Sequence, residues 1–388
     1  AAVQAALAYY GQLLNVTFVA TTDSSSVQMR FGTDNQAGKS AGYAYYPGYS
    51  SAVSGDVWLA NDQSSNQDFS PGSYGWQTLL HEIGHALGLK HPGNYGSGDT
   101  SPFLPSTEDN NLNTVMSYNE APNSLVVSVN GNSANLYNLS PETAMLYDIG
   151  TLQYLYGANT SYHSGNDSYT MGDQPFFKTI WDGGGNDTID CSSLTRECDV
   201  NLTAGSHSSI DLYASALDAA PGFNFSVPPD YTGKDNLTIA WNCTIENAVG
   251  GSGNDKLVGN SVANHLNGGA GNDTLTGGGG NDLFDFTALL NTNSNVDLIT
   301  DFVHGADKIE LSASIFSGLG SAGALSILAF QDLSVTTSVG GAHIVYNPTT
   351  GALYYDTDGS GGGATPIQFA TVGSGSHPAL TAADFQII

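Results

Sequence analysis

Residues 81–91 read HEIGHALGLKH, and this stretch predicts how the first part of the chain folds. His81 and His85 are four apart, so on a helix both imidazoles project from one face and can bind one ion. Glu82 cannot point the same way, but it can take a proton from a water held by that ion. Gly88 predicts the helix end, because a residue without Cβ can adopt the left-handed conformation that brings His91 back to the ion. Three protein ligands leave one position open, as in catalytic zinc sites.

The full string matches the metzincin pattern, which also requires a methionine turn downstream. Residues 114–118, TVMSY, supply that turn and place Met116 25 residues after His91. A pair of histidines alone would more often be a surface or core pair, and a single methionine more often fills a core. The glutamate, the glycine and the third histidine at fixed offsets favour a zinc hydrolase instead.

With these motifs, the chain resembles the serralysins, a bacterial metzincin family secreted with a calcium-binding repeat domain. The zinc helix continues into His91-Pro92-Gly93 as in that family, and the resemblance covers nearly the whole chain. It implies one catalytic zinc on His81, His85 and His91, with Glu82 as general base. It also implies that Tyr118, which ends the methionine turn, is a movable further zinc ligand and a donor to the transition state.

The length of 388 residues predicts two domains, because it is long for a single core. The segment LYGAN at residues 155–159 closely matches the end of the serralysin catalytic domain. We therefore expect an α/β (α+β) metzincin catalytic domain over residues 1–160. An all-β domain with a parallel β-roll and a β-sandwich is expected over residues 161–388, including the secretion signal.

The net charge of the chain argues against two classes of binding partner. Eight Lys and Arg residues stand against 36 Asp and Glu residues, so the net charge of −28 disfavours nucleic acid and anionic membranes, which repel it. No run of 18 apolar residues predicts a membrane span. Many of the carboxylates are instead expected to hold cations.

Apolar spacing predicts the elements of the first domain. Residues 1–14 are expected to form an amphipathic helix, and the zinc helix is expected to begin near Ser73 or Tyr74. A further helix over residues 141–157 has Ser140 as its predicted cap. Four strands are predicted, at residues 16–20, 27–31, 42–46 and 56–60. By resemblance the strand at 42–46 pairs with a peptide substrate, although an ordinary aromatic-rich edge strand explains it equally well.

The ends of the chain carry expectations about processing. Serralysins have a strand before the first helix, and this chain begins at that helix without a signal-peptide pattern. A mature protein made from a zymogen is therefore expected. The final DFQII resembles the tail that a one-step, type I exporter reads, although any β-domain could end this way.

A nine-residue period begins at Gly250 and runs through units 250–258, 259–267, 268–276 and 277–285. Position six is acidic or amide, and position eight is apolar. Glycines let the turns expose carbonyl oxygens, the aspartates add charge, and Ca²⁺ takes six or more such oxygens. The period predicts a parallel β-roll whose turns bind several structural Ca²⁺ ions. A flexible glycine linker would not keep Leu and Asp in phase. The residues of position six are Asp255, Asn264, Asp273 and Asp282, and those of position eight are Leu257, Leu266, Leu275 and Phe284.

The predicted calcium ligands fall into three groups. The roll contributes Gly251, Gly253, Asp255, Asn260, Val262, Asn264, Gly268, Gly269, Ala270, Gly271, Asp273, Gly277, Gly278, Gly279, Gly280 and Asp282. An isolated earlier copy of the repeat contributes Asp182, Gly184, Gly185 and Asp187. The resemblance adds the loop residues His163, Gly165 and Asp167, then Thr244 and Glu246 before the roll, and Asp297 after it. The family has arginine and threonine where this chain has His163 and Asp167.

Three cysteines, Cys191, Cys198 and Cys243, are an odd number. Cys191 and Cys198 could close a small loop in an oxidising compartment, and the sequence leaves open whether they do. The remaining histidines show no metal-ligand spacing and are predicted to lie on the surface or in loops. These are His207, His265, His304, His343 and His377.

Together these patterns indicate a secreted, extracellular zinc endopeptidase stabilised by calcium. The expected partners are protein and peptide substrates, and a proteinaceous inhibitor is a further possible partner. The protein is expected to be a monomer. A calcium-dependent adhesive or structural repeat protein with a vestigial zinc site is the main alternative. A zinc hydrolase of non-peptide substrates is a third reading.

Overall fold

A computed structural model of the chain describes residues 1–48, 52–334, 341–359 and 362–388. It contains two compact units, and each is built from several chain segments. The first unit comprises residues 1–164, 174–184 and 213–243, and the second comprises residues 165–173, 185–212 and 244–388. The domain boundary at residue 160 stays a prediction.

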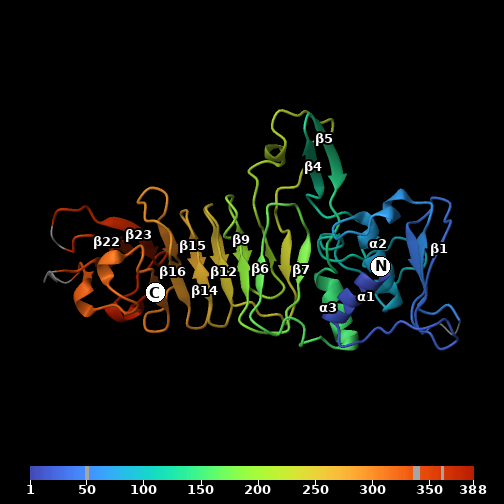
Figure 1. Ribbon diagram of the computed structural model, residues 1–388, viewed down its shortest axis with the longest axis horizontal. Helices are drawn as coiled ribbons and strands as arrows, with labels where there is room; N and C mark the ends of the chain where they lie inside the picture. The colour runs from blue at the N-terminus through green and yellow to red at the C-terminus, as the bar shows by residue number, and fades with distance from the viewer. Residues whose placement is uncertain (49–51, 335–340, 360–361) are drawn as a thin grey trace. The chain divides into compact units, whose positions relative to one another are not determined.

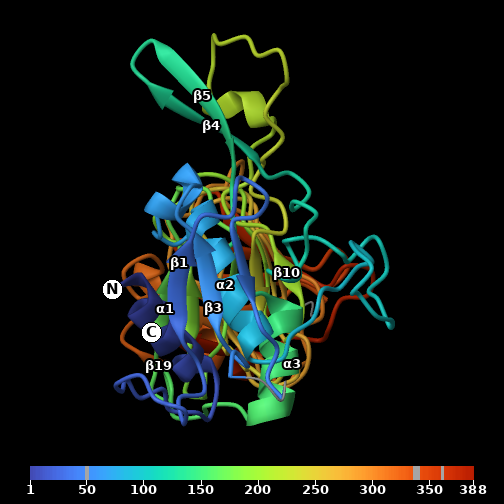
Figure 2. The ribbon, with the colours of Figure 1, turned by 90° about the vertical axis from the view of Figure 1, so that its right-hand side faces the viewer.

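The sheet of the first unit lies beside the predicted zinc helix. Strands β1 (Phe31–Asp34), β3 (Val57–Ala60) and β2 (Gly42–Ala44) form it in that order. β3 pairs parallel with β1 and antiparallel with β2, which leaves β2 at an edge. Helix α2 (Tyr74–Ala86) packs against β2 and β3, and α1 (Ala2–Leu13) packs against α2 (Figure 2).

Helix α2 begins and ends where the sequence predicts. The Ser73 hydroxyl accepts a hydrogen bond from the backbone N–H of Trp76 at 3.1 Å, which satisfies one of the free donors of the first turn. Gly88 follows the last turn with a φ of +104° and reverses the chain. Leu79 and Ile83 are fully buried, so this apolar face fixes the helix and thereby the residues on its other face.

The rest of the first unit consists of short elements. β4 and β5 form an antiparallel hairpin that extends away from the sheet (Figure 2), and β7 pairs parallel with β11. Their bounds are η1 (Ser64–Gln67), β4 (Leu125–Asn130), β5 (Ser133–Asn138), α3 (Leu146–Tyr156), β7 (Lys178–Ile180), η2 (Ala216–Ala219) and β11 (Leu237–Ile239).

Three sequence predictions in this unit are wrong in whole or in part. Helix α3 begins at Leu146 and not at residue 141, because the Asp148 carboxylate accepts from the backbone N–H of Met145 at 2.9 Å and makes that residue the cap. The N–H of Glu142 instead donates to Phe177 O at 2.8 Å. Residues 16–20 form no strand, and the strand predicted at 27–31 starts only at its last residue, because an apolar alternation does not specify a pairing partner.

The second unit is built on two sheets, each of eight strands within the described residues. From β12 to β18 successive strands alternate between the two sheets, and each pairs in parallel with the next strand of its own sheet (Figure 1). One sheet has the order β19-β24-β18-β16-β14-β12-β8-β6, and the other β20-β21-β22-β23-β17-β15-β13-β9. This parallel β-roll, together with the α/β first unit, confirms the predicted fold class.

The roll strands follow the nine-residue period. Their bounds are β12 (Asn247–Val249), β13 (Lys256–Val258), β14 (His265–Asn267), β15 (Thr274–Thr276), β16 (Leu283–Phe286), β17 (Asp297–Ile299) and β18 (Lys308–Leu311). Those before the roll are β6 (Ser168–Thr170), β8 (Thr188–Asp190), β9 (Asp199–Asn201) and β10 (His207–Ser208). Those after it are η3 (Ser317–Leu319), β19 (Gly323–Ala324), η4 (Ile327–Ala329), β20 (Phe330–Asp332), β21 (Ile344–Asn347), β22 (Ala352–Tyr355), β23 (Ile367–Val372), η5 (Ala382–Asp384) and β24 (Phe385–Ile387).

The apolar position eight of the repeat forms the core of the roll. Leu257, Leu266, Leu275 and Phe284 have no exposed surface. Since neighbouring residues of a strand point to opposite faces, the residues on either side of them lie on the outer face.

All three cysteines are buried free thiols, so no bridge joins Cys191 to Cys198. Contact with the Cys198 thiol, followed by burial, raises the pKa of Cys191. Among the helices of the described residues, none is long and apolar enough to cross a membrane.

Removing a position-eight side chain tests the roll core. Leu266→Ala is expected to lower the free energy of unfolding by about 2–5 kcal/mol, because it leaves a cavity between the sheets. Leu289→Ala is the matched control, since Leu289 is 81% exposed and should change stability by less than about 0.5 kcal/mol. Urea unfolding followed by circular dichroism measures both, and equal midpoints for the two variants would contradict the assigned core.

Candidate active site and metal-binding turns

Three imidazoles converge on one point in the first unit. One ring nitrogen from each of His81, His85 and His91 lies within 4.8 Å of the others, and His85 Nε2 is 3.1 Å from His91 Nε2. His81 and His85 come from one face of α2, and the turn at Gly88 delivers His91. The structure thus brings together the three residues that the sequence predicts as zinc ligands.

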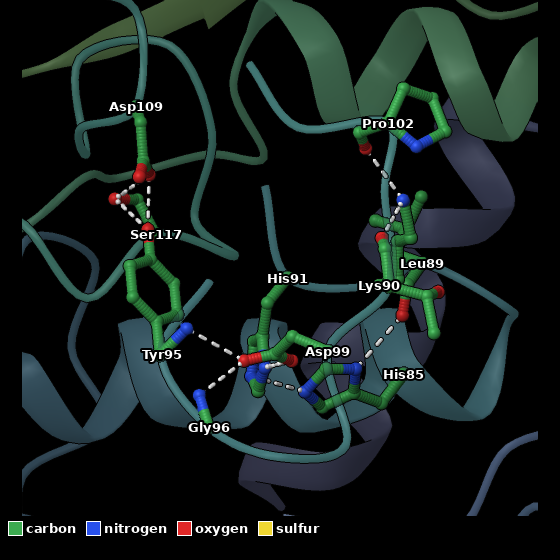
Figure 3. A network of polar contacts seen from close by, with 11 residues as sticks. His85, Leu89, Lys90, His91, Tyr95, Gly96, Asp99, Pro102, Asp109 and Ser117 are labelled. Carbon is green, nitrogen blue, oxygen red and sulfur yellow. Dashed lines mark hydrogen bonds and ion pairs between the residues drawn. The ribbon is translucent and has the colours of Figure 1, made fainter. Parts of the chain in front are cut away.

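The second nitrogen of each ring is held by an oxygen atom, as Figure 3 shows for His85 and His91. The Nδ1 distances are 2.8 Å in each case, for His81 to Val115 O, His85 to Leu89 O and His91 to Asp99 Oδ1. An oxygen acceptor at Nδ1 fixes the proton there and leaves Nε2 with a free lone pair. The three lone pairs therefore face one another, which is the arrangement of a metal site.

Burial favours the neutral imidazole at His81 and His85. It lowers the pKa of His81 to about 3 and that of His85 to about 4, with the charge of neighbouring histidines acting in the same direction. A neutral imidazole is the form that binds a metal, and three such nitrogens suit Zn²⁺. The donor set therefore fits a zinc ion.

Asp99 is a site residue that sequence reasoning missed. Its Oδ1 accepts from His91, and its Oδ2 accepts from the backbone N–H groups of Tyr95 and Gly96, at 2.8 Å each (Figure 3). Burial acts to raise the pKa of Asp99, but these hydrogen bonds outweigh it and lower the pKa. An aspartate within the polar loop of residues 92–113 gives no sequence signal for this role.

A second set of contacts joins that loop to the methionine turn. The hydroxyl of Tyr95 is hydrogen-bonded to the Asp109 carboxylate and lies 3.0 Å from Ser117 Oγ. Ser117 Oγ donates to the same carboxylate at 2.7 Å (Figure 3). The loop that carries Asp99 is thereby tied to the turn that ends at Tyr118.

The methionine turn packs against α2. A Cβ on Gly84 would lie 2.8 Å from Met116 Sδ, so the glycine allows this close approach. The buried Asp148 carboxylate accepts from Thr114 Oγ1 at 2.5 Å and from Val115 N at 2.7 Å. Burial raises the pKa of Asp148 to about 6. Asp148 therefore anchors the turn whose carbonyl orients the first histidine.

Glu82 is buried next to the histidines. It is 6% exposed, and its Oε2 has no hydrogen-bond partner within the described part of the chain. Burial raises its pKa to about 8. A Cβ on Gly42 would lie 2.8 Å from Glu82 Cγ, so the edge strand β2 passes directly over this carboxylate.

Tyr118 lies at the mouth of the site and is 61% exposed. Its ring centre is 4.6 Å from that of His91 and 5.8 Å from that of His81, and it stacks on Tyr95 at 4.6 Å. Burial, then the charge of Glu82, raises its pKa, so the hydroxyl stays protonated and able to donate.

The acidic residues of position six form ladders along the turns of the second unit. Asp273 Oδ1 accepts from the backbone N–H of Asp255 at 2.7 Å, and Asp297 Oδ1 accepts from that of Asp273 at 3.1 Å. In the turns on the opposite side of the roll, Asp282 Oδ1 accepts a hydrogen bond from the backbone N–H of Asn264 at 2.8 Å. The structure thus brings together carboxylates that are 18 or more residues apart.

Two acidic residues of these turns were missed by the sequence analysis. Asp307 Oδ1 accepts from Asp282 N at 3.0 Å and so continues the second ladder. Asp301 accepts from the N–H groups of Gly277 and Gly278 at 2.9 and 2.8 Å. Both lie beyond the last regular repeat, where the nine-residue period no longer marks them.

Close approaches explain the glycines of the repeat. A Cβ on Gly268 would lie 2.3 Å from Asp273 Oδ2, because the carboxylate folds back over the start of its own turn. A Cβ on Gly271 would lie 1.8 Å from the carbonyl oxygen of Gly253, one layer of the roll away. Carbonyl and carboxylate oxygens of adjacent turns therefore meet. The same holds for Gly269 over Gly251 O, Gly278 over Asn260 O, and Gly280 over Val262 O.

The other predicted calcium ligands are divided between the two units. In the first unit Asp182 Oδ1 accepts from Gly184 N at 2.7 Å, and His163 belongs to the same unit. In the second unit Asp187 Oδ1 accepts from Asp167 N and Glu246 Oε2 accepts from Asp187 N, both at 2.8 Å. Gly165 and Gly185 are in contact there, and Thr244 is exposed. Their role as ligands stays a prediction.

Comparisons with known proteins match both units. The family described as Metallo-peptidase family M12 matches residues 10–128. The family described as Peptidase M10 serralysin C terminal matches residues 147–220 and 229–350.

Curated relatives align with most of this chain. The chain is 33% identical to Metalloprotease AprA of Pseudomonas entomophila, over 95% of this chain and 76% of that protein. It is 34% identical to Serralysin of Photorhabdus luminescens, over 89% and 71% of the two chains. It is 36% identical to Serralysin C of Dickeya chrysanthemi, over 86% and 72%.

Removing the carboxylate behind His91 should weaken metal binding. Asp99→Ala is expected to lower zinc affinity about 10–100-fold, because the imidazole loses the acceptor that fixes its orientation. Asp99→Asn keeps an acceptor oxygen and should lose less. Equilibrium dialysis against zinc buffers measures both variants, and an unchanged affinity for Asp99→Ala would show that Asp99 does not orient the ligand.

The buried carboxyl groups of the turns predict that the stability of the second unit depends on pH. Burial raises the pKa of Asp273 to about 8, that of Asp297 to about 7 and that of Asp282 to about 6. A carboxyl whose pKa is raised by folding contributes stability below its unfolded pKa of about 3.9 and loses it as pH rises through the folded value.

In a calcium chelator, we therefore expect the melting temperature of the second unit to fall between about pH 4 and pH 8. Asp273→Asn should flatten this dependence, because it removes the carboxyl with the highest of the three pKa values. Differential scanning calorimetry provides the measurement, and a melting temperature that rises over this range would contradict the assignment.

Proposed function

The chain belongs to the serralysin family of metalloproteases, and from this premise we propose that it is a secreted zinc endopeptidase stabilised by calcium. As a member of the family it is a metalloendopeptidase that depends on zinc and acts on proteins. One observation carries the proposal beyond this: three imidazoles face one point, with the buried Glu82 beside them. Family membership favours this reading over an adhesive repeat protein.

The proposed zinc ligands are His81, His85 and His91. When bound, zinc supplies a Lewis acid that lowers the pKa of a coordinated water from about 15.7 towards about 7. The acceptors at Nδ1 keep the three rings in place for this ion. Tyr118 is proposed as a further, movable ligand, which its exposure at the mouth of the site permits.

Glu82 is proposed as the general base. Burial raises the pKa of Glu82, and a carboxylate whose pKa is raised towards neutral pH is a stronger base that can also return the proton. Its carboxylate accepts the proton of the attacking water and passes it to the leaving amine of the substrate. Gly42 packs against the stem of this side chain and limits its movement.

Tyr118 is proposed to stabilise the transition state. Its protonated hydroxyl donates to the substrate oxygen on which negative charge develops, and one such donor is worth about 3–4 kcal/mol. Its position beside His81 and His91 supports this role.

Strand β2 is proposed to bind the substrate backbone. It lies at the edge of its sheet and passes over Glu82, so an extended peptide added to this edge would bring its scissile bond to the site.

The turns of the second unit are proposed to hold several structural Ca²⁺ ions, on the ligands that the sequence predicts. Their support is chemical: carbonyl and carboxylate oxygens meet between adjacent turns, and buried carboxylates such as Asp273 have a raised pKa. A hard cation offsets the cost of burying those charges and thereby links folding to calcium. Folding outside the cell, where calcium is plentiful, would follow. Export through the C-terminal signal, a monomeric state and a proteinaceous inhibitor stay predictions.

Substitution of Glu82 separates catalysis from metal binding. Glu82→Gln is expected to reduce casein cleavage by about 10²–10⁴-fold, because the amide cannot take a proton from water. Zinc content, measured by mass spectrometry, should not change. Glu120→Gln makes the same substitution at an exposed position of the same unit and should retain activity. Full activity of Glu82→Gln would remove the assigned base.

A further inference from the structure

Three neighbouring strands of the roll carry an unexplained polar cluster on one face. β14, β16 and β18 pair in parallel, with Asn267 opposite Asp285 and Asp285 opposite Glu310. Leu266, Phe284 and Ile309 point into the core, so the side chains next to them point outward. His265, two residues before Asn267 on β14, therefore shares this outer face with Asp285 and Glu310.

The three side chains meet closely. His265 Nε2 lies 2.7 Å from Asp285 Oδ1 and 3.2 Å from Glu310 Oε2. One ligand atom from each residue lies within 4.8 Å of the others. Asp285 and Glu310 are buried residues, 9% and 5% exposed, whereas the side chain of His265 is 41% exposed. Two buried acidic groups thus meet an imidazole that solvent and ions can reach.

One imidazole serves two buried acidic residues in this cluster. The contact of 2.7 Å between His265 Nε2 and Asp285 Oδ1 is an ion pair, and it raises the pKa of His265. Apart from the ion pairs of the cluster, neither atom has a hydrogen-bond partner in the described part of the chain. Burial, followed by the contact with Asp285, raises the pKa of Glu310 to about 7. Buried ligand atoms that face one another, with a single imidazole against two carboxyl groups, are what a bound divalent cation would satisfy.

We propose that His265, Asp285 and Glu310 bind a divalent first-row transition metal ion of the zinc type on the outer face of the roll. Calcium prefers a shell of oxygen atoms, whereas an imidazole nitrogen with two carboxylates suits zinc and its neighbours. Bonds of about 2.1 Å in a tetrahedral site separate the ligand atoms by about 3.4 Å. The observed 3.2 Å between His265 Nε2 and Glu310 Oε2 is close to this, and the 2.7 Å pair needs to open by about 0.7 Å.

Such an ion would join strands that come from different parts of the repeat domain. β14 and β16 belong to the nine-residue repeats, and β18 belongs to the segment that follows them. This site is separate from the calcium turns, because its ligands lie on strands and not in the turns. It is also separate from the histidines of α2, which belong to the first unit.

Zinc stoichiometry tests the proposal in the full chain, folded in calcium and dialysed against a zinc buffer. The parent is expected to hold about one more zinc ion per chain than His265→Gln, because the variant lacks the nitrogen ligand. Casein cleavage should not differ between the two. His304→Gln is the matched control, since His304 Nδ1 also contacts a buried carboxylate, that of Asp384 at 2.8 Å, but pairs with no second acidic residue among those the structure describes. It should keep the zinc content of the parent.

A second variant at another ligand, and the zinc content of the parent, provide independent checks of the proposal. Asp285→Asn changes little in shape and should also lose about one zinc ion. Zinc should raise the melting temperature of the second unit in the parent and in His304→Gln, but not in His265→Gln or Asp285→Asn, whereas stabilisation of the first unit by its own zinc is expected in all four proteins. A parent that holds only about one zinc ion, or a His265→Gln variant with the zinc content of the parent, would overturn the proposal in favour of a plain ion-pair cluster.

Discussion

The contacts at the Nδ1 atoms of three histidines are the constraint on which the active site depends. The carbonyl of Val115 holds His81, and the carboxylate of Asp99 holds His91. Because each Nδ1 is engaged, the three Nε2 lone pairs are directed to one point, and a metal needs little reorganisation to bind. The same contacts attach the methionine turn to α2 through His81 and the loop of residues 92–113 to His91 in the segment after the helix, so ligand geometry and loop structure depend on each other.

Glycines, which have no side chain, make close contacts possible in both units. Gly42 lets an edge strand pass over Glu82, and Gly84 lets Met116 pack under the zinc helix. In the roll, Gly268 makes room for the carboxylate of Asp273. In each case a Cβ would occupy the space of a side chain that the proposed function uses. Glycine is therefore needed here for close approach, and only some of these positions also need a positive φ.

Some of the acidic residues of the chain are buried inside the protein. A net charge of −28 would ordinarily imply a solvated surface, yet Asp273, Asp297 and Glu310 are buried. Their raised pKa values show that an isolated negative charge at these points is costly. Cations offset that cost, and the neighbouring atoms determine which cation fits. Carbonyl oxygens surround the carboxylates in the turns, and an imidazole completes the cluster on the strand face.

Local patterns in the sequence determined the zinc helix, its end at Gly88, the methionine turn and the phase of the roll, because each depends on residues within a few positions of one another. Sequence placed the start of α3 wrongly, since a carboxylate inside the helix, Asp148, replaced the predicted cap. Asp99 and Asp307 were missed for the same kind of reason: their partners are set by loop packing, not by spacing. His265 and Glu310 were likewise brought together only by strand register, because the chain between them crosses from sheet to sheet before it returns to the same face.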